Sequence, residues 1–542
     1  MNTHQPSEHN IATVRDLVVE FDKSGTPFQA LKGIDLDIGI GEIVALVGES
    51  GSGKTVLGSC LLGLVPGDAK TSVTGSVNVE GIDMVHGTER DRRWVRRHVL
   101  GAVFQDPLTS LDPMMRVGAQ VGERGASDDR ILTAFEECGI PEPKVRIRYW
   151  PHQLSGGLRQ RVSIAGAITA ANRPAGKGTE RVDRPEGGIP ALIVADEPTT
   201  ALDVRVQDQI VKLFGRLRDE HGCSVLLITH DLGVAAQIAD RIVVMSHGEV
   251  CESGPTAQII SSPQHPYTQG LIASRLDVSD PFPHREPVQE PPNTLMTMTN
   301  IVKDFRTPHV RGGVKRVLHD VDLQLDAGEA LVLVGESGSG KSTLLRIAAG
   351  LETPTAGFVD IARSAGKPQL IFQDARSSLT PWIRVSKQLG ERLALAGVPR
   401  EERPARVAEL LRQVGLDERM AQSRPRELSG GQCQRAAIAR AMASGPGVLL
   451  CDEPVSALDA TLASQVVDLL DDLRRTTGVA LLFVTHDLAV AKRIATRVAV
   501  LNDGRIVEQG DVQQIFNTPT HHYTRQLLEA SPSLAKVKKV AS

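Results

Sequence analysis

Five short motifs occur twice in this 542-residue sequence, each time in the same order. They begin at Leu46, Phe104, Leu154, Asp196 and Thr229 in the first half, and at Leu333, Phe372, Leu428, Asp452 and Thr485 in the second. A spacing of 34 residues separates Asp196 from His230 and also Asp452 from His486. An ordered repeat with unchanged spacing predicts two copies of one domain in the chain.

The two copies differ in length at one place. Between the third and fourth motifs the first copy holds 18 additional residues, which fall within 171–190. Their glycine, proline and charge content predicts a surface loop. We expect a first domain over 11–275, a proline-rich linker over 276–294 and a second domain over 295–530. In extended form such a linker spans about 60 Å, so the halves can meet as an internal pseudo-dimer.

Composition excludes several classes of protein. Hydrophobic residues make up 41% of the chain and charged residues 23%, values typical of a globular protein and not of a disordered one. A net charge of -4 lacks the positive field of a nucleic-acid coat, so we expect no nucleic-acid partner. No apolar stretch nears the ~20 residues of a membrane span, and the first ten residues lack the apolar core of a secretion signal, which predicts a cytoplasmic chain. Six scattered cysteines favour neither a disulfide framework nor a cysteine metal site.

Continuous apolar runs precede the motifs. The runs at 42–47 and 329–334 lead into the first motif, and similar runs precede the fourth and fifth motifs. Such runs are typical of strands buried on both faces of a parallel sheet. Because ligands bind at the carboxyl ends of strands in open α/β sheets, we expect the motifs to share one edge of each sheet.

The first motif predicts a phosphate-binding loop in both copies. GESGSGKT and GESGSGKS each match GxxxxGK[ST] after an apolar strand. The glycines let successive backbone amides face a phosphate, and the following helix offers its positive end. We expect Lys54 and Lys341 to reach the β- and γ-phosphates, and Thr55 and Ser342 to place a hydroxyl on Mg²⁺.

Paired acidic residues follow later strands in both copies. Asp196 and Asp452 end apolar runs, where they can hold Mg²⁺ directly or indirectly. The adjacent Glu197 and Glu453 face the same opening and can polarise the attacking water. General-base help of this kind is typically worth about 10² to 10⁴ in rate.

Three further polar positions recur. Gln105 and Gln373 follow short apolar runs, so they can ligate the metal or orient water. His230 and His486 follow strands where an imidazole can bond the γ-phosphate, and their matched spacing favours a functional role over a structural one. A serine and two glycines at 155–157 and 429–431 precede predicted helices and form anion sites without a lysine. These turns make sense when they complete a pocket elsewhere.

Together these motifs resemble the ATP-binding subunits of ABC transporters over nearly the whole chain. In that family they correspond to the Walker A loop, the signature sequence, the Walker B strand and the switch histidine, and TALD and SALD resemble the D-loops. The resemblance implies an α/β fold with two tandem P-loop NTPase domains. Each would have a parallel-sheet core, an N-terminal antiparallel β subdomain and a helical subdomain.

Other segments resemble the dipeptide, oligopeptide and nickel importers. They are QDPLTSLDPMMRVG, WPHQLSGGLRQR, SSPQHPYTQGL and NTPTHHYTRQLL. The chain is similar to two ATPase subunits of such importers fused into one. This resemblance implies that ATP hydrolysis drives two separate transmembrane permease subunits. It also implies that an extracytoplasmic solute-binding protein is a partner, and that the chain lies peripherally on the cytoplasmic side of the inner membrane. Dipeptides, longer peptides, nickel chelates and glutathione-like compounds all stay open as cargo.

The resemblance also implies two head-to-tail ATP sites. The first would use Lys54, Thr55, Gln105, Asp196, Glu197 and His230, closed by Ser429, Gly430 and Gly431. The second would use Lys341, Ser342, Gln373, Asp452, Glu453 and His486, closed by Ser155, Gly156 and Gly157. Further nucleotide-binding positions are Gly48, Ser50, Gly51, Gly53, Gly335, Ser337, Gly338, Gly340 and Thr343. The Mg²⁺ ligands would be Thr55, Gln105, Asp196, Ser342, Gln373 and Asp452. Phe21 and Phe305 are the candidates for adenine stacking, with Phe28 as an alternative in the first half.

Two departures and two alternatives accompany this interpretation. Leu158 stands where glutamine is usual in the signature, a substitution common in this subfamily, so we infer no inactive site. No cysteine lies between Cys251 and Cys433, so the iron–sulfur cluster of some relatives is not expected. A soluble tandem ATPase acting on ribosomes or nucleic acid shares the motifs, but usually carries a charged helical linker or zinc modules. The third interpretation is the motor of a multidrug exporter, and the segments that resemble importers argue against it.

Overall fold

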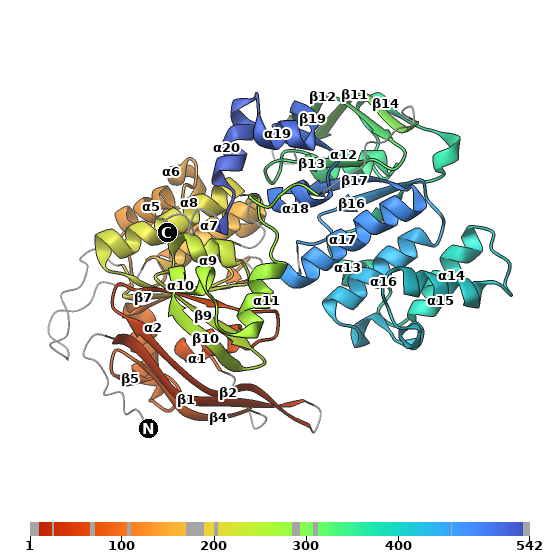
Figure 1. Cartoon of the computed structure of the whole chain (residues 1–542). Helices are drawn as coiled ribbons and strands as arrows, with labels where there is room; N and C mark the ends of the chain where they lie inside the picture. Colours follow the sequence, from red (N-terminus) through yellow and green to blue (C-terminus); the bar gives the residue numbers. More distant parts are fainter. Residues whose placement is uncertain are drawn as a thin grey trace. The chain divides into compact units, whose positions relative to one another are not determined.

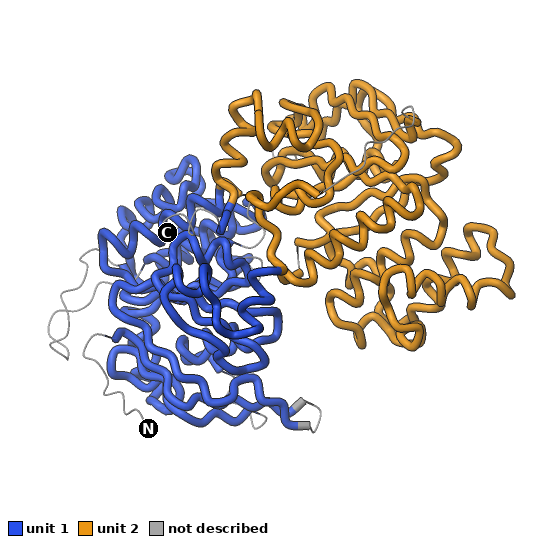
Figure 2. The backbone as a smooth tube through the Cα atoms, in the orientation of Figure 1, with its two compact units in different colours: residues 1–202, 206–273, 532–542 blue, residues 203–205, 274–531 orange. Residues whose placement is uncertain are grey.

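The computed structural model describes residues 10–23, 26–65, 71–105, 110–169, 189–199, 204–283, 293–306, 313–456 and 458–534. The chain forms two compact units (Figure 2). Unit 1 comprises residues 1–202, 206–273 and 532–542, and unit 2 comprises 203–205 and 274–531. Most of the expected 171–190 loop, and residues 284–292 of the expected linker, lie outside the described residues.

Unit 1 contains two sheets (Figure 1). The six-stranded sheet has the order β10-β9-β3-β8-β7-β6 and is parallel except for the β9–β10 pair. Its strands are β3 (Ile43–Val47), β6 (Leu100–Val103), β7 (Leu192–Asp196), β8 (Ser224–Thr229), β9 (Arg241–Ser246) and β10 (Glu249–Pro255). The antiparallel sheet, in the order β2-β1-β4-β5, consists of β1 (Asn10–Lys23), β2 (Thr26–Gly39), β4 (Thr71–Val79) and β5 (Ile82–Asp83).

Helices connect and cover these strands. They are α1 (Lys54–Leu61), α2 (Glu89–His98), α4 (Val117–Val121), α5 (Asp128–Glu137), α6 (Pro143–Arg146), α7 (Gly156–Ala167), α8 (Val204–His221), α9 (Leu232–Ile238), α10 (Thr256–Ser261) and α11 (Pro266–Ser274). A 3₁₀ turn over Pro151–Gln153 precedes α7. The segment from α4 to α7 supplies the predicted helical part of the unit.

The central strand β3 explains why its sequence is apolar without alternation. Ile43, Ala45 and Val47 join one hydrophobic cluster, which also contains residues of α7, α8 and α9. Val44 and Leu46 join the opposite cluster, which contains residues of β1, β2 and α1. A strand covered on both faces has no solvent side on which polar residues would recur.

Unit 2 repeats the plan. Its six-stranded sheet has the order β15-β16-β17-β13-β18-β19, and its antiparallel sheet has the order β12-β11-β14. The strands are β11 (Thr294–Arg306), β12 (Val314–Asp326), β13 (Ala330–Val334), β14 (Ala356–Ile361), β15 (Gln369–Ile371), β16 (Val448–Asp452), β17 (Ala480–Thr485), β18 (Arg497–Asn502) and β19 (Arg505–Asp511). The helices are α12 (Lys341–Ala348), α13 (Ala375–Ser378), α14 (Val385–Leu395), α15 (Arg403–Gln413), α16 (Gly430–Met442), α17 (Ala460–Thr477), α18 (Leu488–Ile494), α19 (Val512–Asn517) and α20 (His522–Ala530). The predicted fold class is confirmed in both units.

Part of the expected linker packs as structure. Leu276, Val278 and Phe282 lie against the hydrophobic core of unit 2. The Lys492 ammonium donates to the Val278 carbonyl at 2.7 Å and lies 4.3 Å from the centre of the Phe282 ring. Three apolar side chains among prolines and acids are too few to reveal a periodicity, so the packing was not visible in the sequence.

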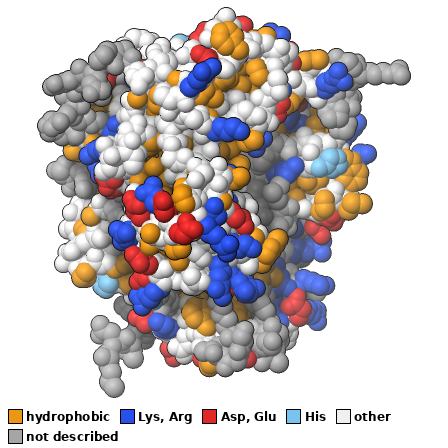
Figure 3. All heavy atoms as spheres, turned by 90° about the vertical axis from the view of Figure 1, so that its right-hand side faces the viewer, with side chains coloured by type: hydrophobic (Ala, Val, Ile, Leu, Met, Phe, Trp, Pro, Cys, Tyr) orange, Lys and Arg blue, Asp and Glu red, His pale blue; other side chains and the backbone are white. Residues whose placement is uncertain are grey.

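All six cysteines are free thiols, and all but Cys251 are buried. Among the described residues, no helix combines the length and apolar character that crossing a bilayer requires. Figure 3 shows positive and negative side chains interspersed with hydrophobic ones over the face that it draws.

Candidate nucleotide site

The first phosphate-binding loop joins β3 to α1 and lies very close to β9. A Cβ atom on Gly48 would lie 2.1 Å from the Met245 carbonyl oxygen, so only glycine fits there. Gly53 is the N-cap of α1 with a φ of 101°, in the left-handed region that glycine adopts without strain. No described side chain caps this helix, so its first amides can serve a bound anion.

The loop of unit 2 is built in the same way. A Cβ atom on Gly335 would lie 2.1 Å from the Leu501 carbonyl oxygen, and Gly340 caps α12 with a φ of 108°. Both loops have an exposed tip, formed by Ser50, Gly51, Ser337 and Gly338. Thr343 is half-buried in the first turn of α12.

Each loop lysine is buried and folded over its own loop. Lys54 is 6% exposed and donates to the carbonyls of Gly48 and Glu49 at 2.7 and 2.8 Å. Lys341 is 5% exposed and makes the equivalent bonds at the same two distances. The loop carbonyls therefore hold each ammonium group beside the glycine-rich turn.

A carboxylate ends the strand beside each loop, and it is buried at Asp196 and half-buried at Asp452. Burial raises the pKa of Asp196, and a hydrogen bond from Thr55 opposes this rise. Burial likewise raises the pKa of Asp452, whose Oδ1 accepts from the Ser342 hydroxyl at 2.9 Å. Among the described residues, Oδ1 of Asp196 is buried without a hydrogen-bond partner. A buried carboxylate oxygen of this kind is stabilised by a donor or a cation.

Glu197 lies at the centre of a polar cluster in unit 1. Its Oε1 lies 3.1 Å from Nδ1 of His230, and its Oε2 accepts from the Gln105 amide at 3.1 Å. Its backbone φ of 47° is left-handed, a conformation that costs a non-glycine residue of order 1–3 kcal/mol. The Glu197 N–H donates to the Ile228 carbonyl at 2.9 Å, which holds the side chain over the sheet edge.

Unit 2 repeats this cluster with one change. Oε2 of Glu453 lies 3.1 Å from Nδ1 of His486, and Glu453 has a φ of 46°. Gln373 differs from Gln105, because its amide donates to the Ser456 hydroxyl at 3.3 Å, which in turn donates to the Glu453 carbonyl. The counterpart of Ser456 is residue 200, which lies outside the described residues.

Hydrogen bonding within the glutamate–histidine pairs favours the charged form of Glu453 and of both histidines. Burial disfavours the charged form of both partners, yet their mutual hydrogen bond lowers the pKa of Glu453 and raises the pKa of His486. Burial opposes charge on His230 too, and the hydrogen bond that its ring shares with the Glu197 carboxylate still raises its pKa. Because Nδ1 faces the carboxylate in each pair, Nε2 is the ring nitrogen left for a further partner.

The signature turns begin α7 and α16. The hydroxyls of Ser155 and Ser429 cap these helices by accepting backbone N–H groups at 3.4 and 3.3 Å. In unit 2 the Gln432 side chain accepts in return from the Ser429 N–H at 2.9 Å, which completes a capping box. Leu158 cannot do so and packs against the core of unit 1 instead. The serine and first glycine of each turn are exposed, whereas Gly157 is half-buried and Gly431 is buried.

The aromatic candidates differ in exposure. Phe21 and Phe28 face each other across β1 and β2, but Phe21 packs against the core while Phe28 is 52% exposed. Phe305 on β11 is 39% exposed, and the Lys303 ammonium lies 5.0 Å from the centre of its ring.

Two tyrosines at the loops were not predicted from the sequence. The Tyr267 hydroxyl accepts from the Glu49 N–H at 3.1 Å, and the Tyr523 hydroxyl accepts from the Glu336 N–H at 3.1 Å. Both lie in the recurring HPYT and HHYT segments, and the chain has only three tyrosines. The recurrence of these segments indicated the importer subfamily, but it did not predict which residues the tyrosines contact.

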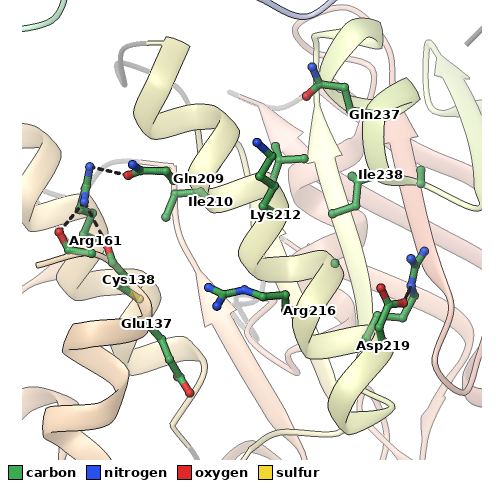
Figure 4. A pocket seen from close by; sticks show the side chains of 15 residues that line it. Glu137, Cys138, Arg161, Gln209, Ile210, Lys212, Arg216, Asp219, Gln237 and Ile238 are labelled. Carbon is green, nitrogen blue, oxygen red and sulfur yellow. Dashed lines mark hydrogen bonds and ion pairs between the residues drawn. The ribbon is translucent and has the colours of Figure 1, made fainter. Parts of the chain in front are cut away.

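One hollow of unit 1 is lined by none of the predicted site residues. A cavity of about 970 Å³ lies among α5, α7, α8 and α9 (Figure 4). Arg161 spans its wall by donating to the Gly139 carbonyl at 2.6 Å and to the Gln209 amide oxygen at 3.2 Å. The nucleotide loops are thus separate from this cavity.

The duplicated loop, the carboxylate at the strand end and the glutamate–histidine pair define an ATP-binding cassette. The family model for the ABC transporter matches residues 31–173 and 318–456, and the chain belongs to this family. It is an ATP-hydrolysing motor subunit of an ABC importer. A second model, described as the oligopeptide/dipeptide transporter C-terminal region, matches residues 251–300 and 507–542.

Characterised relatives resemble nearly the full chain. The peptidoglycan transport ATP-binding protein YejF of Agrobacterium fabrum is 39% identical, over 98% of this chain and 98% of its own. The glutathione import ATP-binding protein GsiA of Pectobacterium atrosepticum is 38% identical, over 97% of this chain and 90% of its own. The solved structure of an RNase-L inhibitor covers 92% of this chain and 91% of its own with a TM-score of 0.61. At 20% identity that likeness shows the fold alone.

Proposed function

We propose that this chain powers the import of peptides or a related small solute through two separate permease subunits. It would act at the cytoplasmic face of the cell membrane, and an extracytoplasmic binding protein would deliver the solute. The match to the oligopeptide/dipeptide C-terminal region in both halves supports a peptide-like solute. The glutathione and peptidoglycan transport relatives support the same class.

One observation carries the proposal of two active sites. Each unit places a glutamate carboxylate 3.1 Å from a histidine, beside a loop whose lysine is buried. In this proposal the glutamate orients and polarises the water that attacks the γ-phosphorus, while Nε2 of the histidine donates to a γ-phosphate oxygen. The γ-phosphoryl group passes to water and ADP leaves with the bridging oxygen. Glu197 and His230 serve the first site, and Glu453 and His486 serve the second.

The residues at each loop also fit Mg²⁺. Hydroxyl and carboxylate oxygens are the ligands that this ion prefers, and Oδ1 of Asp196 is buried without a partner among the described residues. Thr55, Asp196 and Gln105 would hold the ion of unit 1, and Ser342, Asp452 and Gln373 that of unit 2. Bound Mg²⁺ would neutralise charge on the β- and γ-phosphates.

The exposed signature turns support a head-to-tail arrangement of the two halves. Ser155 and Ser429 are exposed N-cap residues of their helices, and neither turn has a lysine of its own. We propose that each turn closes the nucleotide bound by the other domain, with the domains at 11–275 and 295–530 joined by 276–294. Closure with ATP and opening after hydrolysis would then move the permeases. Phe305, and Phe21 or the more exposed Phe28, would stack on adenine.

Uptake by living cells tests this function. Cells that lack the gene are given the wild-type chain, the doubly substituted Glu197→Gln, Glu453→Gln chain, or the control Glu220→Gln, which changes an exposed residue of α8. We expect wild-type and control chains to restore accumulation of a labelled di- or tripeptide, and the double variant to restore none. Equal accumulation with and without the wild-type chain, together with sedimentation of the chain with ribosomes and not with permeases, would refute the importer assignment.

A further inference from the structure

A segment C-terminal to each core sheet returns to the phosphate-binding loop. In unit 1 the segment runs from β10 through α11, and in unit 2 from β19 through α20. We call residues 249–274 and 505–530 the C-terminal extensions. Their tyrosines supply the hydroxyls that accept from the Glu49 and Glu336 N–H groups, each at 3.1 Å.

A chain of matched contacts fixes each tyrosine. Glu252 on β10 accepts from the Gln264 and His265 N–H groups at 2.8 and 3.0 Å. Nδ1 of His265 then accepts from the Tyr267 N–H at 3.2 Å, at the start of α11. The strand, the turn and the helix are thereby held in one geometry, with the phenol directed at the loop.

Unit 2 contains the same chain at equivalent positions. Glu508 on β19 accepts from the Thr520 and His521 N–H groups at 2.7 and 3.2 Å. Nδ1 of His521 accepts from the Tyr523 N–H at 3.3 Å as the cap of α20. Tyr523 is 2% exposed, so its hydroxyl lies in a dry environment where an unpaired polar group is costly. The two copies differ at many other positions, so the repetition of these three residues marks a shared requirement.

We propose that Tyr267 and Tyr523 are positioning residues that couple each C-terminal extension to the phosphate-binding loop of its own unit. Glu49 and Glu336 directly follow the first glycine of each loop, whose later amides must turn toward the phosphates. Holding this peptide by its N–H fixes the direction in which the loop leaves the strand. The loop is then ordered before nucleotide arrives, and less ordering has to accompany binding.

Linkage makes the coupling reciprocal. If the docked extension favours nucleotide binding, bound nucleotide must favour the docked extension to the same degree. The inference rests on the proposed assignment of these loops to ATP. It adds that the extension responds to nucleotide, although it supplies no phosphate ligand itself.

Removing a single hydroxyl tests the coupling in the full-length chain. Tyr267→Phe and Tyr523→Phe keep the ring and its packing, and Tyr149→Phe is the matched control because Tyr149 packs against the unit 1 core from the segment between α6 and α7. We expect each loop variant to weaken ATP binding at its own site by about two- to tenfold, the range for loss of one hydrogen bond. The turnover of saturated enzyme should change much less, and the control should bind ATP like wild type.

Hydrogen exchange supplies a readout that a purely structural role would not move. Nucleotide should increase protection of residues 266–274 and 522–530 in the wild-type chain, and each Tyr→Phe change should abolish that increase in its own unit. Unchanged ATP affinity and unchanged nucleotide-dependent protection in both variants would overturn the inference. Lys54→Ala and Lys341→Ala separate the two proposals. If they too leave ATP binding intact, the assignment of the loops fails, whereas loss of binding in these variants alone refutes only the tyrosine coupling.

Discussion

Glycine is required at two positions of the first loop for different reasons. At Gly48 a Cβ atom would lie 2.1 Å from a backbone oxygen of β9, and backbone cannot yield as a flexible side chain can. A Cβ atom added to Gly51 would meet no other atom within 4 Å, but the backbone φ of 85° at Gly51 is left-handed. We therefore expect Gly48→Ala to abolish ATP binding at the first site and Gly51→Ala to weaken it modestly, by about 1–2 kcal/mol of conformational cost.

Equilibrium binding of a fluorescent ATP analogue measures this difference. The chain should carry Lys341→Ala so that the second site is silent. Gly270 lies on the exposed surface of α11, where an added Cβ atom would meet no other atom within 4 Å, so Gly270→Ala provides the control. Equal losses for Gly48→Ala and Gly51→Ala would show that the close approach to β9 adds nothing to the cost of a side chain at Gly48.

The two strained glutamates carry a second prediction. Glu197→Gln and Glu453→Gln keep the side-chain size and an oxygen that can accept from the glutamine or histidine, but they remove the charge that polarises water. We expect each change to reduce hydrolysis at its own site by about 10² to 10⁴ while ATP still binds. Phosphate release under single-turnover conditions measures the effect. If either variant released phosphate at the wild-type rate, the substituted glutamate would have no role in hydrolysis.

Equivalent ion pairs respond differently to pH in the two units. Glu42 and Glu329 each pair with an arginine at 2.7 Å. Burial opposes the charge on Glu42, but the bonds from Arg241 and the Gly39 N–H still lower its pKa. At Glu329, which is less exposed, burial outweighs the bonds from Asp326 and Arg497 and raises the pKa. Burial and hydrogen bonding thus shift the glutamate pKa in opposite directions in these two equivalent ion pairs.

The sign of each shift gives a pH prediction. A lowered folded pKa stabilises the protein above the ordinary value of 4.5, and this contribution is lost as pH falls through the folded pKa. The stability advantage of wild type over Glu42→Gln should therefore shrink between pH 7 and pH 3. A raised pKa has the reverse effect, so wild type should gain relative to Glu329→Gln over the same range. Hydrogen exchange in β3 and β13 as a function of pH reports each unit separately.

The signature helices allow a comparison within one chain. Gln432→Leu copies the first half and removes the bond to the Ser429 N–H, which we expect to cost about 0.5–1.5 kcal/mol at the start of α16. Exchange of the amides at 429–433 measures the loss. An unchanged exchange rate would mean that solvent replaces the glutamine at no cost.

Sequence patterns predicted the elements better than the contacts between them. The run 42–47 predicted a strand buried on both faces, and β3 is such a strand over Ile43–Val47, because burial of both faces forces an apolar composition. The positions of Glu197 and Glu453 beside their histidines followed from strand ends that share one sheet edge. The contact of Tyr267 with Glu49 joins residues 218 positions apart and depends on how α11 returns to the loop, which no local pattern encodes. The different partners of Gln105 and Gln373 are likewise contacts between residues 92 and 83 positions apart, which no local pattern encodes.

At the scale of the whole molecule, the central expectation is that each nucleotide is held by both halves. A chain carrying Glu453→Gln should hydrolyse ATP only at its first site. In a head-to-tail arrangement Ser429 closes that site, whereas Ser155 closes the silent one. Ser429→Arg places a bulky side chain at an exposed helix start and should abolish the remaining turnover, while Ser155→Arg should reduce it far less.

The reciprocal background makes this prediction decisive. With Glu197→Gln the second site alone is active, and the order of the two serine variants should reverse, Ser155→Arg now being the more damaging. Steady-state phosphate release from the four double variants provides the comparison, and nucleotide-free unfolding curves show whether either serine change disturbs folding. If each arginine instead silenced the site in its own unit in both backgrounds, the halves would act as independent ATPases. Coupled closure could then not drive a permease pair.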